Sequence, residues 1–128
     1  MSQCPCRPDR RYAECCEPWH RGVPAPDAES LMRSRYSAFA LELTDYLLAT
    51  WHPAHRPPAL ELTPGLTWLG LTIKSVRATG EDTAEVHFVA RSRRGGGPAQ
   101  RHEERSRFRR EAGRWYYLEG DLTPTRLR

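Results

Sequence analysis

The chain has 128 residues, of which 38% are hydrophobic and 28% are charged, and its formal net charge is +4. This length allows one compact domain that buries about two-thirds of its unfolded surface, and it excludes a second full domain. The apolar runs, such as 47–49, are far too short to span a bilayer, which excludes a helical membrane protein and any partner inside a membrane.

Cysteines are confined to the start of the chain, at positions Cys4, Cys6, Cys15 and Cys16. Two close thiol pairs joined by a short polar loop suit a tetrahedral Zn²⁺ site, which needs four ligands at about 2.3 Å from one ion. We therefore predict a zinc knot over residues 1–22 with these four thiolates as ligands. Four protein ligands leave no position for water, so the predicted zinc is structural rather than catalytic.

Disulfides and a redox thiol pair are the alternatives to zinc. A bridge between the adjacent Cys15 and Cys16 would be strained, and the sequence has no C-x-x-C motif. No apolar leader with a cleavage site precedes the cysteines, so we expect a reducing, cytoplasmic location. His20 is an alternative fourth ligand in place of Cys16, because imidazole is another common zinc donor.

Two helices are predicted after the cysteines. Residues 23–26 carry two prolines and predict an extended linker. Asp27 then suits the N-cap of a helix to about Leu43. Its apolar residues recur at helical spacing in one stripe, Met32, Tyr36, Phe39 and Leu43. Residues 44–51 predict a second, short helix, and the four prolines within 53–65 predict a loop.

The rest of the chain has the two-residue period of strands. Four strands are predicted, over residues 66–76, 83–93, 101–111 and 115–119. In the first strand we expect Leu69, Leu71 and Ile73 on one face. Helices followed by a four-stranded antiparallel meander indicate an α+β fold, with the helices packed on one face of a curved sheet.

Several runs of residues carry a family resemblance along nearly the whole chain: Cys4–Cys6, Tyr12–Cys16, Leu31–Phe39, Tyr46–Leu47, Thr50–Pro53, Trp68–Leu69, Glu104–Phe108 and Trp115–Gly120. They resemble the YchJ-like family of small bacterial proteins. The resemblance implies a SEC-C zinc motif over 1–22, followed by a cystatin-like, or nuclear-transport-factor-2-like, cone over 23–128 that encloses a pocket. The chain departs from the usual Cys-Gly-Ser-Gly-Lys motif at 7–11, which reads Arg-Pro-Asp-Arg-Arg.

A pocket in such a cone has a few polar groups within an apolar lining. The candidate pocket residues are Arg33, Arg35, Tyr36, Trp68, Glu104, Ser106, Trp115 and Tyr117. Among them, we expect Glu104 to form a buried ion pair with Arg33 or Arg35, which would fix the helix against the sheet. By strand alternation, His87 is expected to face solvent with Glu85, and no residue is predicted to be catalytic.

Two hypotheses of function follow from these features. In the first, the zinc knot presents Arg10 and Arg11 to a protein partner and the cone is a scaffold. The resemblance supports this non-enzymatic adaptor, because the SEC-C tail of the bacterial secretion ATPase contacts an export chaperone and the ribosome. The alternative is a small-molecule-binding or catalytic cone, with a pocket formed by Arg33, Tyr36, Glu104 and aromatic residues.

A third interpretation, RNA binding, rests on the basic segment 91–114, which has nine arginines against three glutamates. It is less favoured, because no recognised nucleic-acid motif accompanies the arginines. Exposed strand edges are compatible with a homodimer as well as a monomer.

Overall fold

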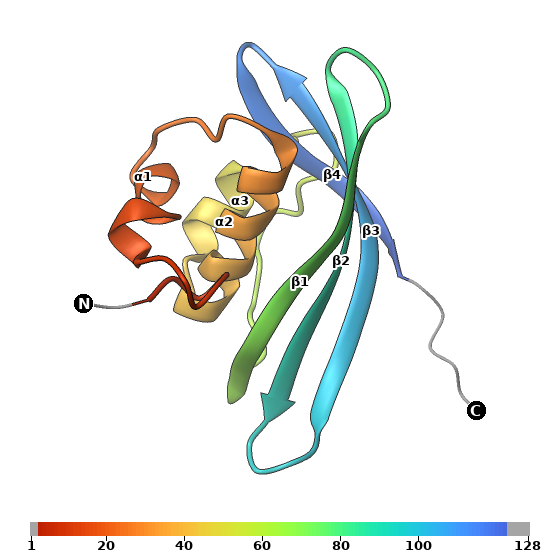
Figure 1. Ribbon diagram of the computed structural model, residues 1–128. Helices are drawn as coiled ribbons and strands as arrows, with labels where there is room; N and C mark the ends of the chain where they lie inside the picture. Colours follow the sequence, from red (N-terminus) through yellow and green to blue (C-terminus); the bar gives the residue numbers. More distant parts are fainter. Residues whose placement is uncertain (1–2, 123–128) are drawn as a thin grey trace.

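The computed structural model describes residues 3–122 and is drawn as a ribbon in Figure 1. Its elements, in chain order, are a 3-10 turn (Tyr12–Glu14), α1 (Glu17–His20), α2 (Ala28–Leu41), α3 (Thr44–Ala49), β1 (Leu66–Ala78), β2 (Thr83–Arg94), β3 (Ala99–Glu111) and β4 (Arg114–Leu122). The strands pair in sequence order, each antiparallel to the next. The helices lie together on one face of the bent sheet, which confirms the predicted α+β arrangement (Figure 1).

The ends of the two predicted units, residues 1–2 and 123–128, lie outside the described part of the chain. Within 3–122, no helix is long and apolar enough to cross a membrane.

Helix α2 begins at the predicted cap and ends two residues earlier than predicted. The Asp27 carboxylate accepts a hydrogen bond of 2.8 Å from the backbone N–H of Ser30, which satisfies one of the free donors of the first turn. At the other end Glu42 takes a left-handed conformation, with φ of 60°, and this stops the helix. Leu43 therefore becomes the N-cap of α3 instead of the last residue of the α2 stripe.

β1 contains a bulge that simple alternation did not predict. Trp68 pairs with Ser92 and Gly70 pairs with Arg91, so Leu69 is an extra residue between two pairs. The bulge places Leu69 in solvent, while Trp68, Leu71 and Ile73 pack against the core. The prediction that Leu69 shares one face with Leu71 and Ile73 was wrong, because one inserted residue exchanges the two faces of a strand.

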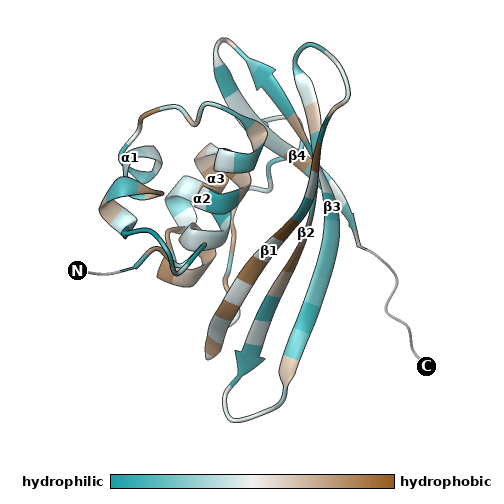
Figure 2. Cartoon of the chain, viewed as in Figure 1, coloured by the Kyte–Doolittle hydropathy of each residue, from teal (hydrophilic) through white to brown (hydrophobic). Residues whose placement is uncertain are grey.

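One hydrophobic core runs through both parts of the molecule. It includes the four cysteines, Leu31 and Tyr36 of α2, and Val86 and Phe108 of the sheet. Figure 2 shows the apolar residues concentrated along β1 and β2, whereas much of β3 is hydrophilic. The N-terminal residues 3–22, which we call the cysteine segment, are thus packed onto the body of the protein through this common core.

We expect Asp27→Ala to lower the free energy of unfolding by about 1 kcal/mol, because it removes the N-cap acceptor of α2. Asp27→Asn is the matched control, since an asparagine side chain also accepts at this position, and it should change stability by only a few tenths of that amount. Urea denaturation of the three proteins measures the difference. Equal stability of the alanine variant and the parent would contradict this role of the cap.

Candidate functional site

The four cysteine sulfurs converge into one buried cluster. The Sγ–Sγ distances are 3.6 Å for Cys4–Cys6, 3.6 Å for Cys6–Cys15, 3.7 Å for Cys6–Cys16 and 4.0 Å for Cys15–Cys16, and all four sulfurs lie within 4.8 Å of one another. A tetrahedron of sulfurs at about 2.3 Å from a central zinc ion has edges of about 3.8 Å. The cluster therefore has the size of a closed four-thiolate metal site, whereas disulfides would need sulfurs about 2.05 Å apart.

The loop between the two cysteine pairs closes without the glycines of the usual motif. The backbone N–H of Cys4 donates to the carbonyl of Arg10 at 2.8 Å, and that of Arg7 donates to the carbonyl of Cys4 at 3.1 Å. The Arg7 guanidinium also pairs with the Asp9 carboxylate at 2.7 Å. The 3-10 turn then brings Cys15 back toward Cys6. Backbone hydrogen bonds and this local ion pair shape the loop that departs from the usual sequence.

The electrostatics of the cluster favour a bound cation. Hydrogen bonds with Cys4 and Cys6, together with burial, raise the pKa of the Cys16 thiol. Hydrogen bonds from Cys16 and Cys6 lower the pKa of Cys4, so one thiolate is stabilised by protonated neighbours. Four thiolates at these distances would repel one another strongly. A divalent cation offsets this repulsion, and soft sulfur ligands suit zinc.

Helix α2 contacts the cluster through Ser37. Its buried hydroxyl lies 3.3 Å from the Cys16 sulfur and 3.4 Å from the Cys4 sulfur. Arg33, one turn earlier, donates from Nη1 to the Cys6 carbonyl at 3.4 Å and from Nε to Glu29 at 3.0 Å. Ser37 was not predicted from the sequence. Ser37 lies outside the apolar stripe predicted for this helix, and no local pattern in the sequence marks it.

His20, the alternative zinc ligand, is engaged elsewhere through both ring nitrogens. Nε2 lies 2.8 Å from the carbonyl of Ser34 and Nδ1 lies 2.6 Å from the Tyr12 hydroxyl. A carbonyl only accepts, so Nε2 carries the proton and Nδ1 accepts from Tyr12. Burial lowers the pKa of His20, which keeps the ring neutral. The imidazole links α1 to α2 through the hydrogen bond to Ser34. These contacts do not support His20 as a zinc ligand.

A cavity of about 580 Å³ lies between α2 and the inner face of the sheet. Six of the eight candidate pocket residues line it, namely Arg35, Tyr36, Trp68, Glu104, Ser106 and Tyr117. Further aromatic walls come from Phe39, Trp51 and Phe88. Arg33 and Trp115 are not among the lining residues. Arg33 contacts the cysteine segment instead, and Trp115 lines a groove described below.

Arg35 is a buried cation that joins three elements. Nη1 donates to the carbonyl of Leu47 at 2.8 Å and to the hydroxyl of Thr50 at 2.7 Å, which ties α2 to the end of α3. The guanidinium lies 4.5 Å from the ring centre of Tyr117 and 5.5 Å from that of Trp51. Burial lowers the pKa of Arg35 to about 10, so the group remains charged at neutral pH.

Glu104 does not form the predicted ion pair with Arg33 or Arg35. It accepts hydrogen bonds from His102 Nε2 at 2.9 Å, the Ser106 hydroxyl at 2.6 Å and the Tyr117 hydroxyl at 3.3 Å. Burial raises the pKa of Glu104, but these donors outweigh burial, and the pKa lies below its usual value. The prediction was wrong because donors on the sheet beside Glu104, rather than an arginine of the helix, form the hydrogen bonds with its carboxylate.

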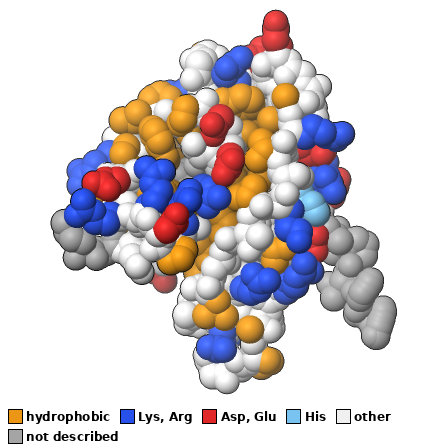
Figure 3. All heavy atoms as spheres, in the orientation of Figure 1, with side chains coloured by type: hydrophobic (Ala, Val, Ile, Leu, Met, Phe, Trp, Pro, Cys, Tyr) orange, Lys and Arg blue, Asp and Glu red, His pale blue; other side chains and the backbone are white. Residues whose placement is uncertain are grey.

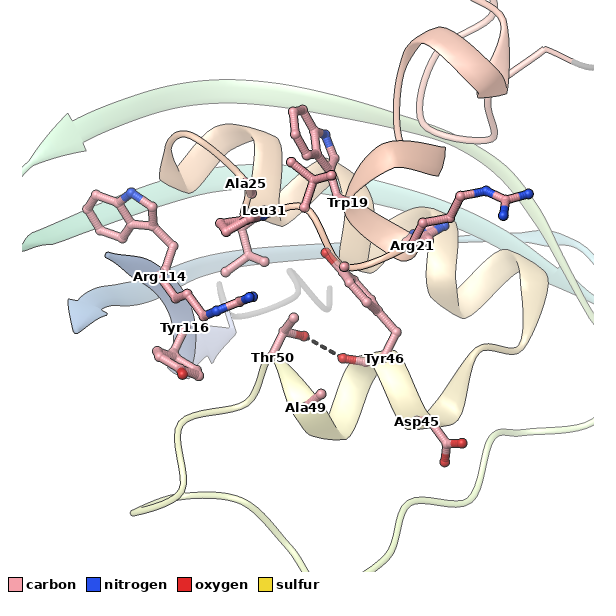
Figure 4. A pocket seen from close by; sticks show the side chains of 15 residues that line it. Trp19, Arg21, Ala25, Leu31, Asp45, Tyr46, Ala49, Thr50, Arg114 and Tyr116 are labelled. Atoms are coloured by element: carbon pink, nitrogen blue, oxygen red, sulfur yellow. Dashed lines mark hydrogen bonds between the residues drawn. The ribbon is translucent and has the colours of Figure 1, made fainter. Parts of the chain in front are cut away.

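A groove of about 530 Å³ lies on another side of the helices, between α1, α3 and the start of β4. Figure 4 shows Trp19 of α1, Arg21 just after that helix, Tyr46 of α3, and Arg114 and Tyr116 of β4 around it. The groove is therefore formed jointly by the cysteine segment and the body of the protein.

The arginine-rich outer face of the sheet is largely paired with acidic side chains. Its ion pairs include Arg77–Glu85 at 2.9 Å, Arg107–Asp121 at 2.8 Å and Arg110–Asp82 at 2.9 Å. On β2, Nε2 of the half-buried His87 lies 2.6 Å from a carboxylate oxygen of Glu103 on β3. This pairing reduces the basic potential that RNA binding would need.

Comparisons with known proteins agree with this structure. The family model described as "YchJ, middle NTF2-like domain" matches residues 27–120. The chain belongs to the YchJ-like family. A UPF0225 protein from Xanthomonas campestris is 57% identical over 118 residues, covering 91% of this chain and 92% of the relative. A UPF0225 protein from Bordetella pertussis is 52% identical over 123 residues, covering 93% of this chain and 92% of the relative.

Two solved structures share the fold. The solution structure of a SEC-C motif containing protein from Rhodopseudomonas palustris has a TM-score of 0.83 and 38% identity, and the match covers 94% of this chain and 98% of that chain. The crystal structure of a SEC-C motif containing protein from Psychrobacter arcticus has a TM-score of 0.80 and 28% identity, covering 99% and 86%. The family resemblance and the fold inferred from the sequence are confirmed.

Gly120 provides the space that Glu104 occupies. A Cβ at Gly120 would overlap the Glu104 carboxylate and lie 2.8 Å from its Cγ. We expect Gly120→Ala to destabilise the protein by about 1–3 kcal/mol, because Glu104 must leave its three donors or the strands must separate. In a Glu104→Ala background the same substitution should have little additional effect. Thermal and urea denaturation of the four proteins test this, and additive effects would refute it.

Proposed function

We propose that the four cysteines bind one structural Zn²⁺ and that the cysteine segment forms part of a docking surface for a protein partner. On this proposal the protein is a non-enzymatic interaction module, and the cone is the scaffold that holds the surface. The observation that carries the proposal is the groove shared by the cysteine segment and the cone, because neither part provides it alone.

The role of zinc follows from the size and burial of the cysteine cluster. All four cysteines are buried, and the sulfur–sulfur distances of 3.6–4.0 Å are close to the edges of a tetrahedral site. Four thiolates around one ion leave no position for water or substrate. The segment has one 3-10 turn and a four-residue helix, which is little regular structure of its own. A metal ion would hold its two ends together and keep it packed on Ser37 of α2.

The groove suits an extended peptide that carries both apolar and acidic side chains. Trp19, Tyr46 and Tyr116 supply aromatic surface, and Arg114 supplies positive charge. Arg21 also lines the groove, but its guanidinium is already paired with Glu17 at 2.8 Å. Aromatic residues and arginine are the residue types that contribute most at protein interfaces.

The surface of the segment extends this basic character. Arg11 forms an ion pair with the Glu14 carboxylate at 3.0 Å. Arg10 instead donates a hydrogen bond to the backbone carbonyl of Glu14, and this contact does not neutralise its charge. Figure 3 shows basic and acidic side chains mixed on this part of the molecule, next to the grey N-terminus. A partner with an acidic surface would meet Arg10 without displacing an existing ion pair.

The zinc site makes a prediction about Ser37. Purified, reduced protein should hold about one equivalent of zinc, with thiols that react only after a chelator is added. Ser37→Ala should lower zinc affinity about 10- to 100-fold, because it removes the hydroxyl that contacts two sulfurs. Ser34→Ala, in the same helix and equally buried, should leave affinity unchanged. Competition with a chromophoric chelator measures the affinities. Freely reactive thiols in metal-supplemented protein would overturn the zinc assignment.

The docking surface makes a prediction about charge reversal. Arg114→Glu in the groove and the pair Arg10→Glu, Arg11→Glu on the segment should each reduce the retention of a cross-linked partner at least several-fold, because they oppose its acidic groups. Arg91→Glu, at an exposed position of β2, is the control and should retain the partner. Cys4→Ser, Cys6→Ser should lose it even when circular dichroism shows a folded cone. A partner retained equally by every variant would contradict this docking surface.

A further inference from the structure

The cavity between α2 and the sheet has an apolar side and a polar side. Its volume of about 580 Å³ falls within the range typical of ligand pockets. Trp68 of β1, with Phe88 and Ala90 of β2, forms the apolar side, and α2 adds Phe39. The polar side lies on β3, around the Glu104 carboxylate. An apolar ligand would therefore lie along β1 and β2, where Figure 2 shows the apolar residues of the sheet.

The apolar side leads from the core of the protein to its surface. Alternate residues of β2 line the cavity, and they change from the buried Phe88 and Ala90 through the half-buried Ser92 to the exposed Arg94. We call the end at Arg94 the cavity mouth. Phe88 and Ser92 are four residues apart on one strand, which is about 13 Å. This length suits an extended aliphatic chain of medium size.

The strand register brings three hydrogen-bond donors together at the cavity mouth. Ser92 pairs with Gln100 of β3, and Arg94 lies two residues further along the same face of β2. All three side chains line the cavity, and none of them has a hydrogen-bond or ion-pair partner among residues 3–122. A guanidinium, an amide and a hydroxyl all donate to carboxylates, and the guanidinium does so with two parallel bonds. The cavity mouth therefore suits an anionic head group.

The other charges of the cavity favour the mouth as the position of that head group. Glu104 lies four residues from Gln100 on the same face of β3, about 13 Å away. This distance exceeds the Debye length of about 8 Å at physiological ionic strength, so Glu104 repels an anion at the exposed mouth only weakly. Arg101 also lines the cavity, but its guanidinium is paired with Glu103 at 2.8 Å. Arg94 is thus the cation that a ligand would meet at the mouth.

We propose that this cavity binds a medium-chain aliphatic carboxylate, with its head group among Arg94, Ser92 and Gln100 and its chain along Ala90 and Phe88. The single charge of a carboxylate matches the guanidinium of Arg94, whereas a phosphate ester would add a second negative charge without a second cation. The site is separate from the cysteine cluster and from the groove, and it does not depend on the proposed protein partner.

The test uses probes that differ either in the head group or in the length of the chain. Octanoate, 1-octanol, octylamine and octyl phosphate share one chain, and hexanoate and decanoate vary its length. Isothermal titration calorimetry on the full-length protein should show that octanoate binds about tenfold more tightly than 1-octanol, since a hydrogen bond to a charged group is the stronger one. Each pair of methylenes added from hexanoate to decanoate should tighten binding about tenfold, because the added methylenes are buried.

Substitutions at exposed positions locate the head group without disturbing the core. Arg94→Gln should weaken octanoate about 5- to 10-fold and change 1-octanol much less, and Gln100→Ala should weaken octanoate about 2- to 3-fold. Arg91→Gln is the matched control. It removes the same charge from an exposed position of β2, but Arg91 is not among the lining residues, so octanoate binding should not change.

The position of the chain has a spectroscopic test. In a ¹H–¹⁵N spectrum, octanoate should shift the indole N–H signal of Trp68, which lines the cavity, and leave that of Trp19, which lines the groove. A shift of Trp19 without one of Trp68 would place the probe in the groove and overturn the assignment.

Four further results would contradict the proposal. Octanoate binding that is absent, or no tighter than that of 1-octanol, would remove the carboxylate. Tighter binding of octyl phosphate or octylamine would assign the cavity to another class of ligand. An affinity that does not depend on chain length would exclude a buried chain. Equal weakening by Arg94→Gln and Arg91→Gln would show attraction to the net charge of the protein in place of a site at the mouth.

Discussion

Helix α2 is the element on which the rest of the structure depends, because it is buried on two sides. Residues at helical spacing on one side, Ser34 and Ser37, contact α3 and the cysteine cluster. Residues on the other side, Arg35, Tyr36 and Phe39, line the cavity under the sheet. A helix packed on both sides has no long polar face, so its buried polar residues must each find a specific partner. This requirement accounts for the position of the cysteine segment as well as for the shape of the cavity.

The buried polar residues on the two sides of α2 find their partners in different ways. Toward α3 and the cysteine segment the fully buried polar side chains are small, and nearby oxygen and sulfur atoms satisfy the hydroxyls of Ser34 and Ser37. Toward the sheet the polar group is the long, charged side chain of Arg35, which is satisfied only in part by Leu47 and Thr50. Packing against aromatic rings stabilises the charge but does not use its remaining donors. The first side is therefore a structural contact, whereas the second forms a wall of the cavity.

A bulge on each outer strand contributes to the cavity wall. In β1 the extra residue Leu69 turns Trp68 inward to meet Tyr36. Between β3 and β4 a register shift follows Arg107, and Tyr117 then lies opposite Phe108 with its hydroxyl on Glu104. Both bulges change which side chains face the helices without changing the order of the strands.

The sequence by itself determined which residues form the cysteine cluster, the cap of α2 at Asp27 and the order of the strands. These features depend on local spacing and on the period of apolar residues, which can be seen without a fold. Only the tertiary structure decided which polar groups meet. Arg33 contacts the cysteine segment, and the carboxylate of Glu104 is satisfied by residues of its own sheet. Small changes in strand register and helix rotation decide which of several competing partners lies within hydrogen-bond distance. Such differences arise from bulges and packing between distant segments, and no local pattern records them.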